Sequence, residues 1–390
     1  MKKVILWIIC IILVSGMVLV MSSGCTSQGA AAETTAAAGT TAAAAGGNIS
    51  GSAYDIVKMS GEKVAAVEKG KGKGVIAILS NTADIPIMIA QKGQNEATAA
   101  KYGYETVYFN SDWDMATQAD QIETAIEMGV DGMIIVAIDE KAIIPTLQKV
   151  KDAGIPVVTE DGGALESPET TGLVVCNVAA DNFRAGELAA EYIAWRLKGI
   201  GKVAVSGYES VKPGRDRTNG VYNVLKHYPQ IEIAAYGEGA SVPSGLEVTE
   251  DFIQRVPDLD AIYAVNDPFG EGAYQAVLAA GKQDQIFICG NDGDPAALEL
   301  IRSTQGKTYA YSSAQWPQIM GVVAMENLIA AIEGRDEDII ANVEQQGVHQ
   351  SWPTFAVAPF PVSIETIDSY PGWDVAVDWK SIAPYPIWWQ

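Results

Sequence analysis

The chain has 390 residues, a formal net charge of −22, four cysteines and two histidines. Such a negative charge argues against a nucleic-acid-binding protein, which needs basic patches, and two histidines cannot build a histidine-cluster metal site. Roughly 320 residues follow a low-complexity start, which is too long for one small core and suits two lobes. We expect neither a metal nor a cofactor.

Residues 1–24 have the features of an export signal. Lys2 and Lys3 form a charged start, residues 4–20 are apolar, and small residues precede Cys25. The ending Ser-Ser-Gly-Cys resembles a lipobox, in which the peptide is cleaved before Cys25 and the thiol receives lipid. The apolar run is also long enough to span a bilayer, so an uncleaved anchor or a cleaved secreted protein are the alternatives. In each case the body of the protein is exported.

Residues 25–72 lack the apolar content of a folded segment. Alanine, threonine, glycine and serine dominate its first half, and they bury too little apolar area to offset the entropy of ordering the chain. We therefore expect a flexible spacer between Cys25 and the body. The Lys-Gly repeat of residues 69–74 precedes the first predicted strand, whereas a phosphate-binding loop follows its strand, so no phosphate site is predicted there.

From Val75 onward, short apolar runs alternate with segments of helical periodicity. The predicted strands are residues 75–79, 105–109, 132–138, 156–159, 172–176, 202–206, 232–236, 261–265, 286–290 and 309–313. Helix signals are Pro86, Asp114 with Gly129, the apolar positions of 144–150, Asp181, and a last apolar segment up to Gly334. Regular alternation of strands and helices predicts an α/β fold with parallel sheets and helices on both faces.

A weak internal repeat places one acid in each half of the body. The order strand, acid, helix, strand, Asp-Gly occurs around residue 131 and again around residue 260, ending at Asp161 and at Asp292. Ligands of open parallel sheets bind beyond the carboxyl ends of the strands. Each acid alone could instead cap the next helix. Two matched positions favour a cleft between two lobes, with Asp161 and Asp292 in it.

Several segments, in this order, resemble the type I periplasmic binding proteins, in the branch that includes ribose- and galactose-binding proteins. They are GVIAILSNTADIPIM, EMGVDGMIIVAID, GIPVVTEDGG, AADNFRAGELAAEYI, GRDRTNG, YAVNDPFGEGAYQAV, FICGNDGDP and AQWPQIMG. The resemblance covers about residues 73–340 and implies two Rossmann-like lobes with parallel sheets, joined by a three-segment hinge.

The implied hinge crossings lie near residues 178–181, 314–315 and 337–343. They divide the body into an N-terminal lobe of residues 73–179 plus 316–338 and a C-terminal lobe of residues 180–315 plus 339–362. Residues 363–390, rich in tryptophan and proline, form a C-terminal strap. We expect the strap to pack along both lobes; the alternative is a rim over the cleft or a docking surface.

The resemblance also implies a set of ligand-binding residues. The positions that match the family's sugar-binding residues are Asp161, Arg217, Asn266, Asp292 and Gln315. Carboxylates accept hydrogen bonds from vicinal hydroxyls, and a guanidinium donates to ring or hydroxyl oxygens. These residues therefore predict a small polar ligand, with a sugar or polyol favoured over other polar metabolites.

The aromatic positions depart from the family pattern. Sugar binders of this branch tend to carry two aromatic residues where this chain has Ile87 and Met88, which makes these two possible ligand contacts. Aromatic rings stack on the C–H faces of sugars. Replacement faces could come from residues beside strand ends, for each of which packing at a lobe surface is the alternative: Trp113, Tyr208, Phe269 and Trp316.

The resemblance implies an exported solute-binding lipoprotein that captures its ligand by closing the hinge and delivers it to an ABC permease. It would act as a monomer at the outer face of the cytoplasmic membrane or in the periplasm, held to the membrane only through Cys25. The alternative is a ligand-sensing component of a chemotaxis or two-component receptor. An enzyme is not predicted, because no Gly-rich turn follows Leu79 and no nucleophile motif or paired metal ligands occur.

Overall fold

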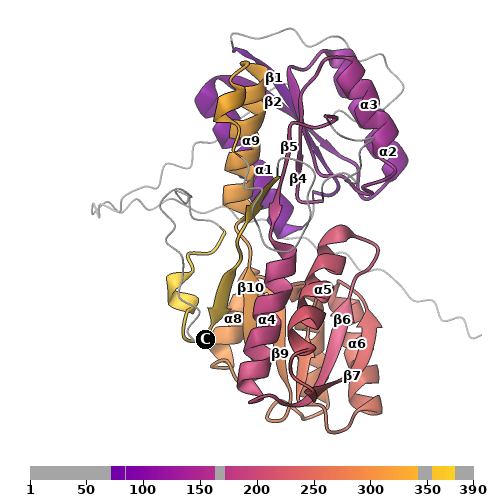
Figure 1. Ribbon diagram of the computed structural model, residues 1–390, viewed down its shortest axis with the longest axis vertical. Helices are drawn as coiled ribbons and strands as arrows, with labels where there is room; N and C mark the ends of the chain where they lie inside the picture. The colour runs from indigo at the N-terminus through magenta and orange to yellow at the C-terminus, as the bar shows by residue number, and fades with distance from the viewer. Residues whose placement is uncertain (1–71, 84, 163–171, 341–353, 374–390) are drawn as a thin grey trace, which may run out of the picture. The chain divides into compact units, whose positions relative to one another are not determined.

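Two six-stranded sheets with helices on both faces make up the described part of the chain (Figure 1). The computed structural model describes residues 72–83, 85–162, 172–340 and 354–373. The chain divides into units 1–50 and 51–390, and all described residues belong to the second unit. The predicted export signal, Cys25, nearly all of the spacer and residues 374–390 of the strap lie outside the described residues. Within the described ranges, no helix is long and apolar enough to cross a membrane.

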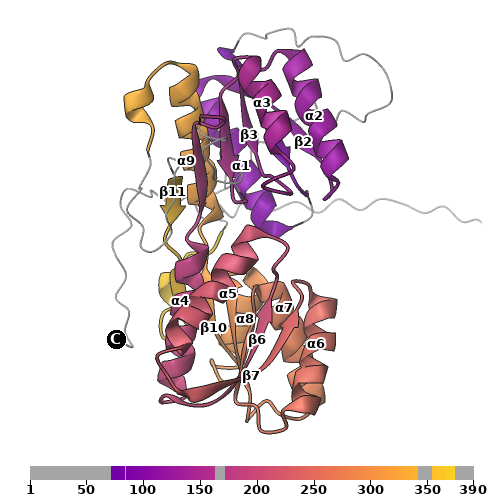
Figure 2. The same cartoon turned by 45° about the vertical axis from the view of Figure 1, so that its right-hand side comes forward.

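The first lobe is a parallel sheet with helices on both faces. Its elements are β1 (Gly74–Ser80), α1 (Pro86–Tyr102), β2 (Tyr104–Asn110), α2 (Met115–Met128), β3 (Gly132–Ile135), α3 (Ile144–Asp152), β4 (Val157–Glu160), β5 (Cys176–Ala180), α9 (Pro317–Ile332) and β11 (Thr354–Val357). The strand order is β11-β5-β4-β3-β1-β2. Helices α1 and α9 cover one face of the sheet, and α2 and α3 cover the other (Figure 2).

The second lobe repeats this plan. Its elements are α4 (Asn182–Arg196), β6 (Ile200–Gly207), α5 (Lys212–Leu225), β7 (Gln230–Glu238), α6 (Val242–Arg255), β8 (Ala261–Tyr263), α7 (Asp267–Ala279), β9 (Phe287–Asp292), α8 (Pro295–Ser303), β10 (Tyr309–Ala314) and β12 (Phe360–Ser363). The order is β12-β10-β9-β8-β6-β7, and only the edge strand β12 runs antiparallel to its neighbour. Helices α4 and α5 pack on one face and α6, α7 and α8 on the other.

The central strands are apolar along their whole length because both faces are covered. In β1, Ile76 and Ile78 pack toward α1 and α9, whereas Val75, Ala77 and Leu79 pack toward α2 and α3, and all five are buried. Successive side chains of a strand point to opposite faces, so a strand covered on both sides reads as a continuous apolar run. This confirms the predicted α/β fold with two parallel sheets.

The predicted helix ends are confirmed by the backbone. Asp114 accepts a hydrogen bond from the Thr117 amide at the start of α2, and Gly129 ends that helix with φ 68°. Asp181 accepts from the Arg184 amide at the start of α4. The strand predicted at 172–176 is displaced, since β5 spans Cys176–Ala180. Apolar runs identify a buried segment, but its ladder partners decide where the strand lies.

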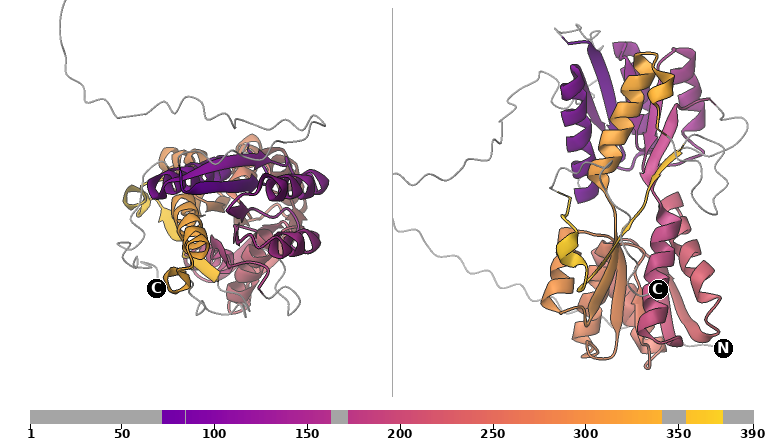
Figure 3. Two further views of the ribbon diagram at one scale, coloured as in Figure 1. Left: turned by 90° about the horizontal axis from the view of Figure 1, so that it is seen from above. Right: turned by 60° about the vertical axis from the view of Figure 1, so that its left-hand side comes forward.

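The chain passes between the two sheets at three places, visible in the right view of Figure 3. It crosses after β5, after β10, and between β11 and β12. The third crossing differs from the prediction near 337–343, and the assignment of all of 339–362 to the second lobe does not hold. Strand β11 pairs in parallel with β5 of the first sheet, with Phe355 opposite Val178. Which sheet an edge strand joins depends on a pairing partner that its own pattern does not specify.

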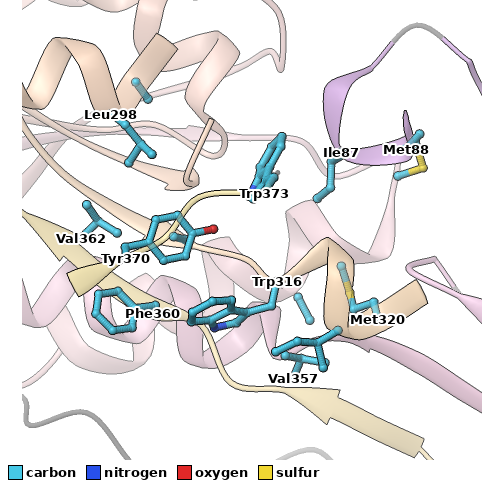
Figure 4. Packing of buried hydrophobic residues seen from close by; sticks show 14 of the residues in the cluster. Ile87, Met88, Leu298, Trp316, Met320, Val357, Phe360, Val362, Tyr370 and Trp373 are labelled. Carbon is cyan, nitrogen blue, oxygen red and sulfur yellow. The ribbon is translucent and has the colours of Figure 1, made fainter. Parts of the chain in front are cut away.

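The described part of the strap packs against the hinge. The Tyr370 hydroxyl donates to the Gln315 carbonyl at 2.5 Å, and Gln318 Nε2 donates to the Gly372 carbonyl at 2.9 Å. Trp316 packs edge-on against Tyr370, with ring centroids 5.0 Å apart. Trp373 lies buried in the same cluster, which Figure 4 shows. Residues 363–373 therefore pack beside the hinge, and none of them lines the cleft described below.

Two glycines let helices α4 and α5 touch along their backbones. A Cβ atom on Gly186 would lie 1.9 Å from the Arg217 carbonyl oxygen, and one on Gly220 would lie 2.1 Å from the Phe183 carbonyl oxygen. No side chain fits at either place. This close approach brings α5, and with it Arg217, directly beside the first turn of α4.

We predict that Gly220→Ala lowers the free energy of unfolding by roughly 1–3 kcal/mol, because the added methyl group forces the two helices apart. Gly93→Ala is the matched control: Gly93 lies exposed in α1 and its Cβ would meet nothing within 4 Å. The control should gain about 0.5–1 kcal/mol from its higher helix propensity. Urea unfolding followed by circular dichroism measures both. Equal stability of Gly220→Ala and the unchanged protein would contradict the packing described.

Candidate functional site

A cleft of about 750 Å³ is lined by residues of both lobes. The first lobe contributes residues that follow β1, β3 and β4, and the second lobe contributes residues that follow β6 and β8 and the last residue of β9. The carboxyl ends of both parallel sheets therefore meet the cleft, as the topology of such sheets requires of a ligand site. Nine of the residues predicted from the sequence line it: Ile87, Met88, Trp113, Asp161, Tyr208, Arg217, Asn266, Asp292 and Gln315.

Two predicted aromatic residues do not line the cleft. Phe269 is fully buried in α7 inside the second lobe. Trp316 is buried in the hinge, where it packs against Phe360 and Tyr370. For both residues the packing alternative is correct. A side chain that follows a strand end can turn into the core as readily as into the cleft, and the sequence pattern does not distinguish the two.

The floor of the cleft is a buried ion pair. Arg217 Nη2 lies 2.7 Å from Asp292 Oδ1, with the side chains 8% and 13% exposed. Arg217 Nε donates to Asn182 Oδ1 at 2.8 Å, and its Nη1 donates to the Val265 carbonyl at 2.9 Å. A buried charge is tolerated only when it is paired and hydrogen-bonded, and each nitrogen of this guanidinium has a partner. The guanidinium plane is thereby fixed.

Gln315 connects this floor to the hinge. Its Nε2 donates to Asp292 Oδ1 at 2.6 Å. Its Oε1 is buried and has no partner within the described ranges. A buried acceptor without a donor is unusual in a folded protein and marks a place for a missing hydrogen bond. Because Gln315 lines the cleft, a hydroxyl group of a bound molecule could supply that donor.

Asp161 reaches the same cleft from the first lobe. Burial raises the pKa of its carboxyl group to about 6; Arg217 lowers this pKa and Asp292 raises it. Burial likewise raises the pKa of Asp292, while Arg217 and Gln315 favour its charged form. Two carboxylates and one guanidinium, contributed by both lobes, thus converge at mostly buried positions of the cleft. Hydrogen bonds to charged groups are strongest in such surroundings.

Both carboxylates sit on strained backbone. Asp161 has φ 60° and Asp292 has φ 117°, and each precedes a glycine. A non-glycine residue at positive φ costs energy and persists only where its surroundings hold it. The same strain occurs at the corresponding position of each lobe. This supports the view that the orientation of the two carboxylates matters for function.

Asp267 holds the strained turn at Asp292 and was not predicted from the sequence. One of its carboxylate oxygens accepts hydrogen bonds from the Gly293 and Asp294 amides at 2.8 and 2.9 Å. The Tyr309 and Ser312 hydroxyls also donate to this fully buried carboxylate. The available signal was that this acid directly follows Asn266 in the repeat. Its partners, however, come from the turn after β9 and from strand β10, both distant in the sequence.

Asn266 has a structural function in addition to its place in the cleft wall. Its Oδ1 accepts from the Phe269 amide at 3.0 Å and so caps α7, and its Nδ2 donates to the Ala240 carbonyl at 2.9 Å. An amide nitrogen carries two hydrogens. One hydrogen of Nδ2 is therefore left for a ligand.

An ion pair joins the two lobes across the cleft. Arg215 Nη2 of α5 lies 2.7 Å from Glu140 Oε1 in the loop after β3. Asp139 holds that loop by accepting hydrogen bonds from the Lys141 and Ala142 amides. Arg215 Nη1 also donates to the Glu209 carbonyl at 3.0 Å. The lobes are thus in direct contact, through two residues that the sequence analysis did not single out.

The two lobes, the three crossings and the cleft define a hinged binding protein. The sequence model of the family described as periplasmic binding protein domain matches residues 76–336. The chain belongs to this family. Its members are binding proteins rather than enzymes, so the predicted family and the absence of a catalytic function are confirmed.

Two relatives and one solved structure illustrate the similarity. The ribose import binding protein RbsB of Bacillus subtilis is 30% identical over 266 residues, which cover 68% of this chain and 84% of that protein. The xylitol-binding protein of Mycolicibacterium smegmatis is 30% identical over 224 residues, covering 56% and 62%. An ABC transporter solute-binding protein from Actinobacillus succinogenes with bound D-allose superimposes with a TM-score of 0.67 at 28% identity, covering 76% of this chain and all of that one.

Glu160 lies directly before Asp161 at the end of β4, and its buried side chain contacts Asn95 of α1. Its Oε2 accepts a hydrogen bond from Asn95 Nδ2 at 2.8 Å, and its Oε1 has no partner within the described ranges. Burial raises the pKa of Glu160 to about 8, above its ordinary value of 4.5. The folded protein therefore holds this proton more tightly than the unfolded chain. The corresponding stability is complete below about pH 4.5 and is lost as the pH rises toward 8.

We predict that Glu160→Gln flattens the pH dependence of stability. The amide is isosteric with the protonated acid, and it can donate to the unpaired Oδ1 of Asn95. The unchanged protein should lose stability between about pH 5 and pH 8, and the variant should lose up to ~1.4 kcal/mol less per pH unit. Urea unfolding across this range measures the slope, with exposed Glu127→Gln as the control. The same slope in both variants would show that Glu160 is charged in the folded state.

We also predict that Glu140→Gln opens the cleft of the ligand-free protein. The pair is partly exposed, so its loss should cost no more than about 1 kcal/mol and shift the closed population up to about five-fold. Spin labels on Glu127→Cys and Glu247→Cys, exposed sites in different lobes, report the inter-lobe distance. The charge swap Glu140→Arg with Arg215→Glu should restore the closed population and the shorter label distance.

The control for this measurement is a pair within one lobe. Lys202 lies 2.7 Å from Asp258, and Lys202→Gln should leave the label distance unchanged. Raising the salt concentration should mimic Glu140→Gln, because salt screens partly exposed charges. If neither Glu140→Gln nor added salt changes the label distance, the pair of Glu140 and Arg215 has no role in closure.

Proposed function

We propose that this protein is the solute-binding component of an ABC importer and that it captures a small polyhydroxylated ligand, a sugar or polyol, in its cleft. The observation that carries the proposal is the floor of Arg217, Asp292 and Gln315, faced by Asp161 from the other lobe. It combines fixed donors, charged acceptors and an unpaired acceptor. A ligand with several neighbouring hydroxyl groups satisfies all of these at once.

Each group has a definite part in recognition. Asp161 and Asp292 accept hydrogen bonds from vicinal hydroxyls, which a carboxylate can take two at a time. The Arg217 guanidinium, fixed on three sides, donates to a ring or hydroxyl oxygen. Gln315 accepts a hydroxyl hydrogen through Oε1, which otherwise lacks a donor. Ile87 and Met88 supply an apolar wall in place of aromatic rings.

Ligand binding and hinge closure are coupled in this arrangement. Asp161 belongs to the first lobe, whereas Arg217 and Asp292 belong to the second. A ligand that touches all three gains the full set of contacts only in the closed state, and it shifts the population toward that state. The closed state then presents both lobes together to a membrane permease.

The relatives support both the ligand class and the setting. Their names refer to ribose import and xylitol binding, and the similar solved structure contains D-allose. We further propose that Cys25 carries lipid at the outer face of the cytoplasmic membrane. The spacer that follows it would keep a mobile binding protein close to its permease and raise its effective concentration there.

We predict that one or more pentoses, hexoses or polyols raise the thermal unfolding midpoint of the purified protein. A ligand at 100 times its Kd adds about 2.7 kcal/mol if it binds only the folded form. Asp292→Ala should abolish the shift because it removes the partner of Arg217 and two acceptor oxygens. Asp284→Ala, at an exposed site outside the cleft, should retain it. A shift that survives Asp292→Ala would place binding elsewhere, and no shift with any of these compounds would refute the ligand class.

A further inference from the structure

The cleft is larger than a single sugar ring needs, although the lobes already touch. A water molecule takes about 30 Å³ in the liquid, so the twelve non-hydrogen atoms of a hexose take at most ~360 Å³ at that spacing. The cleft measures about 750 Å³. The contact of Arg215 Nη2 with Glu140 Oε1 at 2.7 Å shows that this volume belongs to a state in which the lobes meet. The volume of the cleft therefore exceeds that of one ring, and part of the excess lies where the cleft opens to solvent.

Two exposed aromatic rings line the cleft, one from each lobe. Trp113, between β2 and α2, is 47% exposed, and Tyr208, between β6 and α5, is 38% exposed. The polar floor of Arg217, Asp292 and Gln315 is nearly closed to solvent. The rings therefore lie toward the outer part of the cleft, and the hydroxyl-binding groups lie at its inner end.

The backbone at Trp113 is strained. Asp112 and Trp113 have φ angles of 49° and 60°, a rare conformation for a non-glycine residue. The Trp113 amide donates to the Asn81 carbonyl at 2.8 Å, which anchors the strained turn to the end of β1. Strain of this kind gathers at functional sites, where the direction of a side chain matters.

Tyr208 is held by a close backbone contact as well. A Cβ atom on Gly214 would lie 2.2 Å from the Tyr208 carbonyl oxygen, so the first turn of α5 rests directly on this residue. The same helix carries Arg217 one turn further on. The backbone of Tyr208 thus packs against the helix that supplies Arg217.

We propose that the ligand has two parts: a hydroxylated ring on the polar floor and a second ring with a flat face, held in the outer cleft by Trp113 and Tyr208. This rests on the proposed function, because it assigns the inner part to the same residues. The shared chemistry is a hydroxylated ring joined to a second ring, which occurs in disaccharides, aryl glycosides and nucleosides. Tryptophan and tyrosine provide large rigid faces for stacking on such a ring.

Isothermal titration with matched probes tests this. Free ribose, glucose, galactose and xylitol are compared with the disaccharides cellobiose and lactose, with phenyl glucoside and phenyl galactoside, and with the nucleosides adenosine and uridine. We expect at least one two-ring probe to bind ten-fold or more tightly than its one-ring counterpart. Trp113→Ala and Tyr208→Ala should each weaken that probe about ten-fold and weaken one-ring ligands much less. Trp113→Phe, which keeps an aromatic face, should retain most of the affinity.

Controls and outcomes separate this proposal from the proposed function. Trp195→Ala and Tyr228→Ala alter exposed rings outside the cleft and should change nothing. If one-ring sugars bind as tightly as every two-ring probe and lose binding only in Asp292→Ala, the second ring is refuted and the proposed function stands. If a two-ring probe binds regardless of Asp292→Ala, the polar floor is not its site. If no probe binds, both proposals fail.

Discussion

The ion pair between Arg217 and Asp292 is the constraint that organises the second lobe. A guanidinium and a carboxylate removed from water are stable only when they are paired and hydrogen-bonded, and three separate segments supply the further partners of this pair. Helix α4 brings Asn182, the segment after β8 brings the Val265 carbonyl, and the hinge brings Gln315. The glycine contacts between α4 and α5, and the turn that Asp267 holds, place the two charges within hydrogen-bond distance.

The hinge and the cleft share one residue. Gln315 donates to Asp292 through its side chain and accepts from the Tyr370 hydroxyl through its carbonyl. Tyr370 in turn packs with Trp316 and Phe360, which belong to two of the three connections between the lobes. Gln315 therefore connects the cleft floor to the aromatic cluster beside the hinge. The described part of the strap, residues 363–373, packs at that cluster, and none of these residues lines the cleft.

Sequence reasoning located most of the cleft because the relevant signals are local. Asp161 and Asp292 follow buried strands and precede glycines, and the topology of parallel sheets sends both toward the same edge. Arg217 and Gln315 were placed by resemblance and do line the cleft. Phe269 and Trp316 were predicted as possible ligand contacts because they follow strand ends, but both side chains are buried. A position after a strand end is compatible with either outcome. Asp267, Asn182 and the Glu140–Arg215 pair were missed because their importance comes from partners 26 to 75 residues away.

The sequence by itself determined the order and type of the elements, their caps and the α/β class. Helical periodicity, strand-length apolar runs, capping side chains and terminal glycines act over a few residues, and each can be read without knowing the rest of the chain. Only the tertiary structure decided that β11 joins the first sheet, that Asn266 caps a helix, and that Arg215 reaches Glu140. Pairing partners, burial and the direction of a strained side chain depend on residues far apart in the chain, which meet only when the lobes have formed.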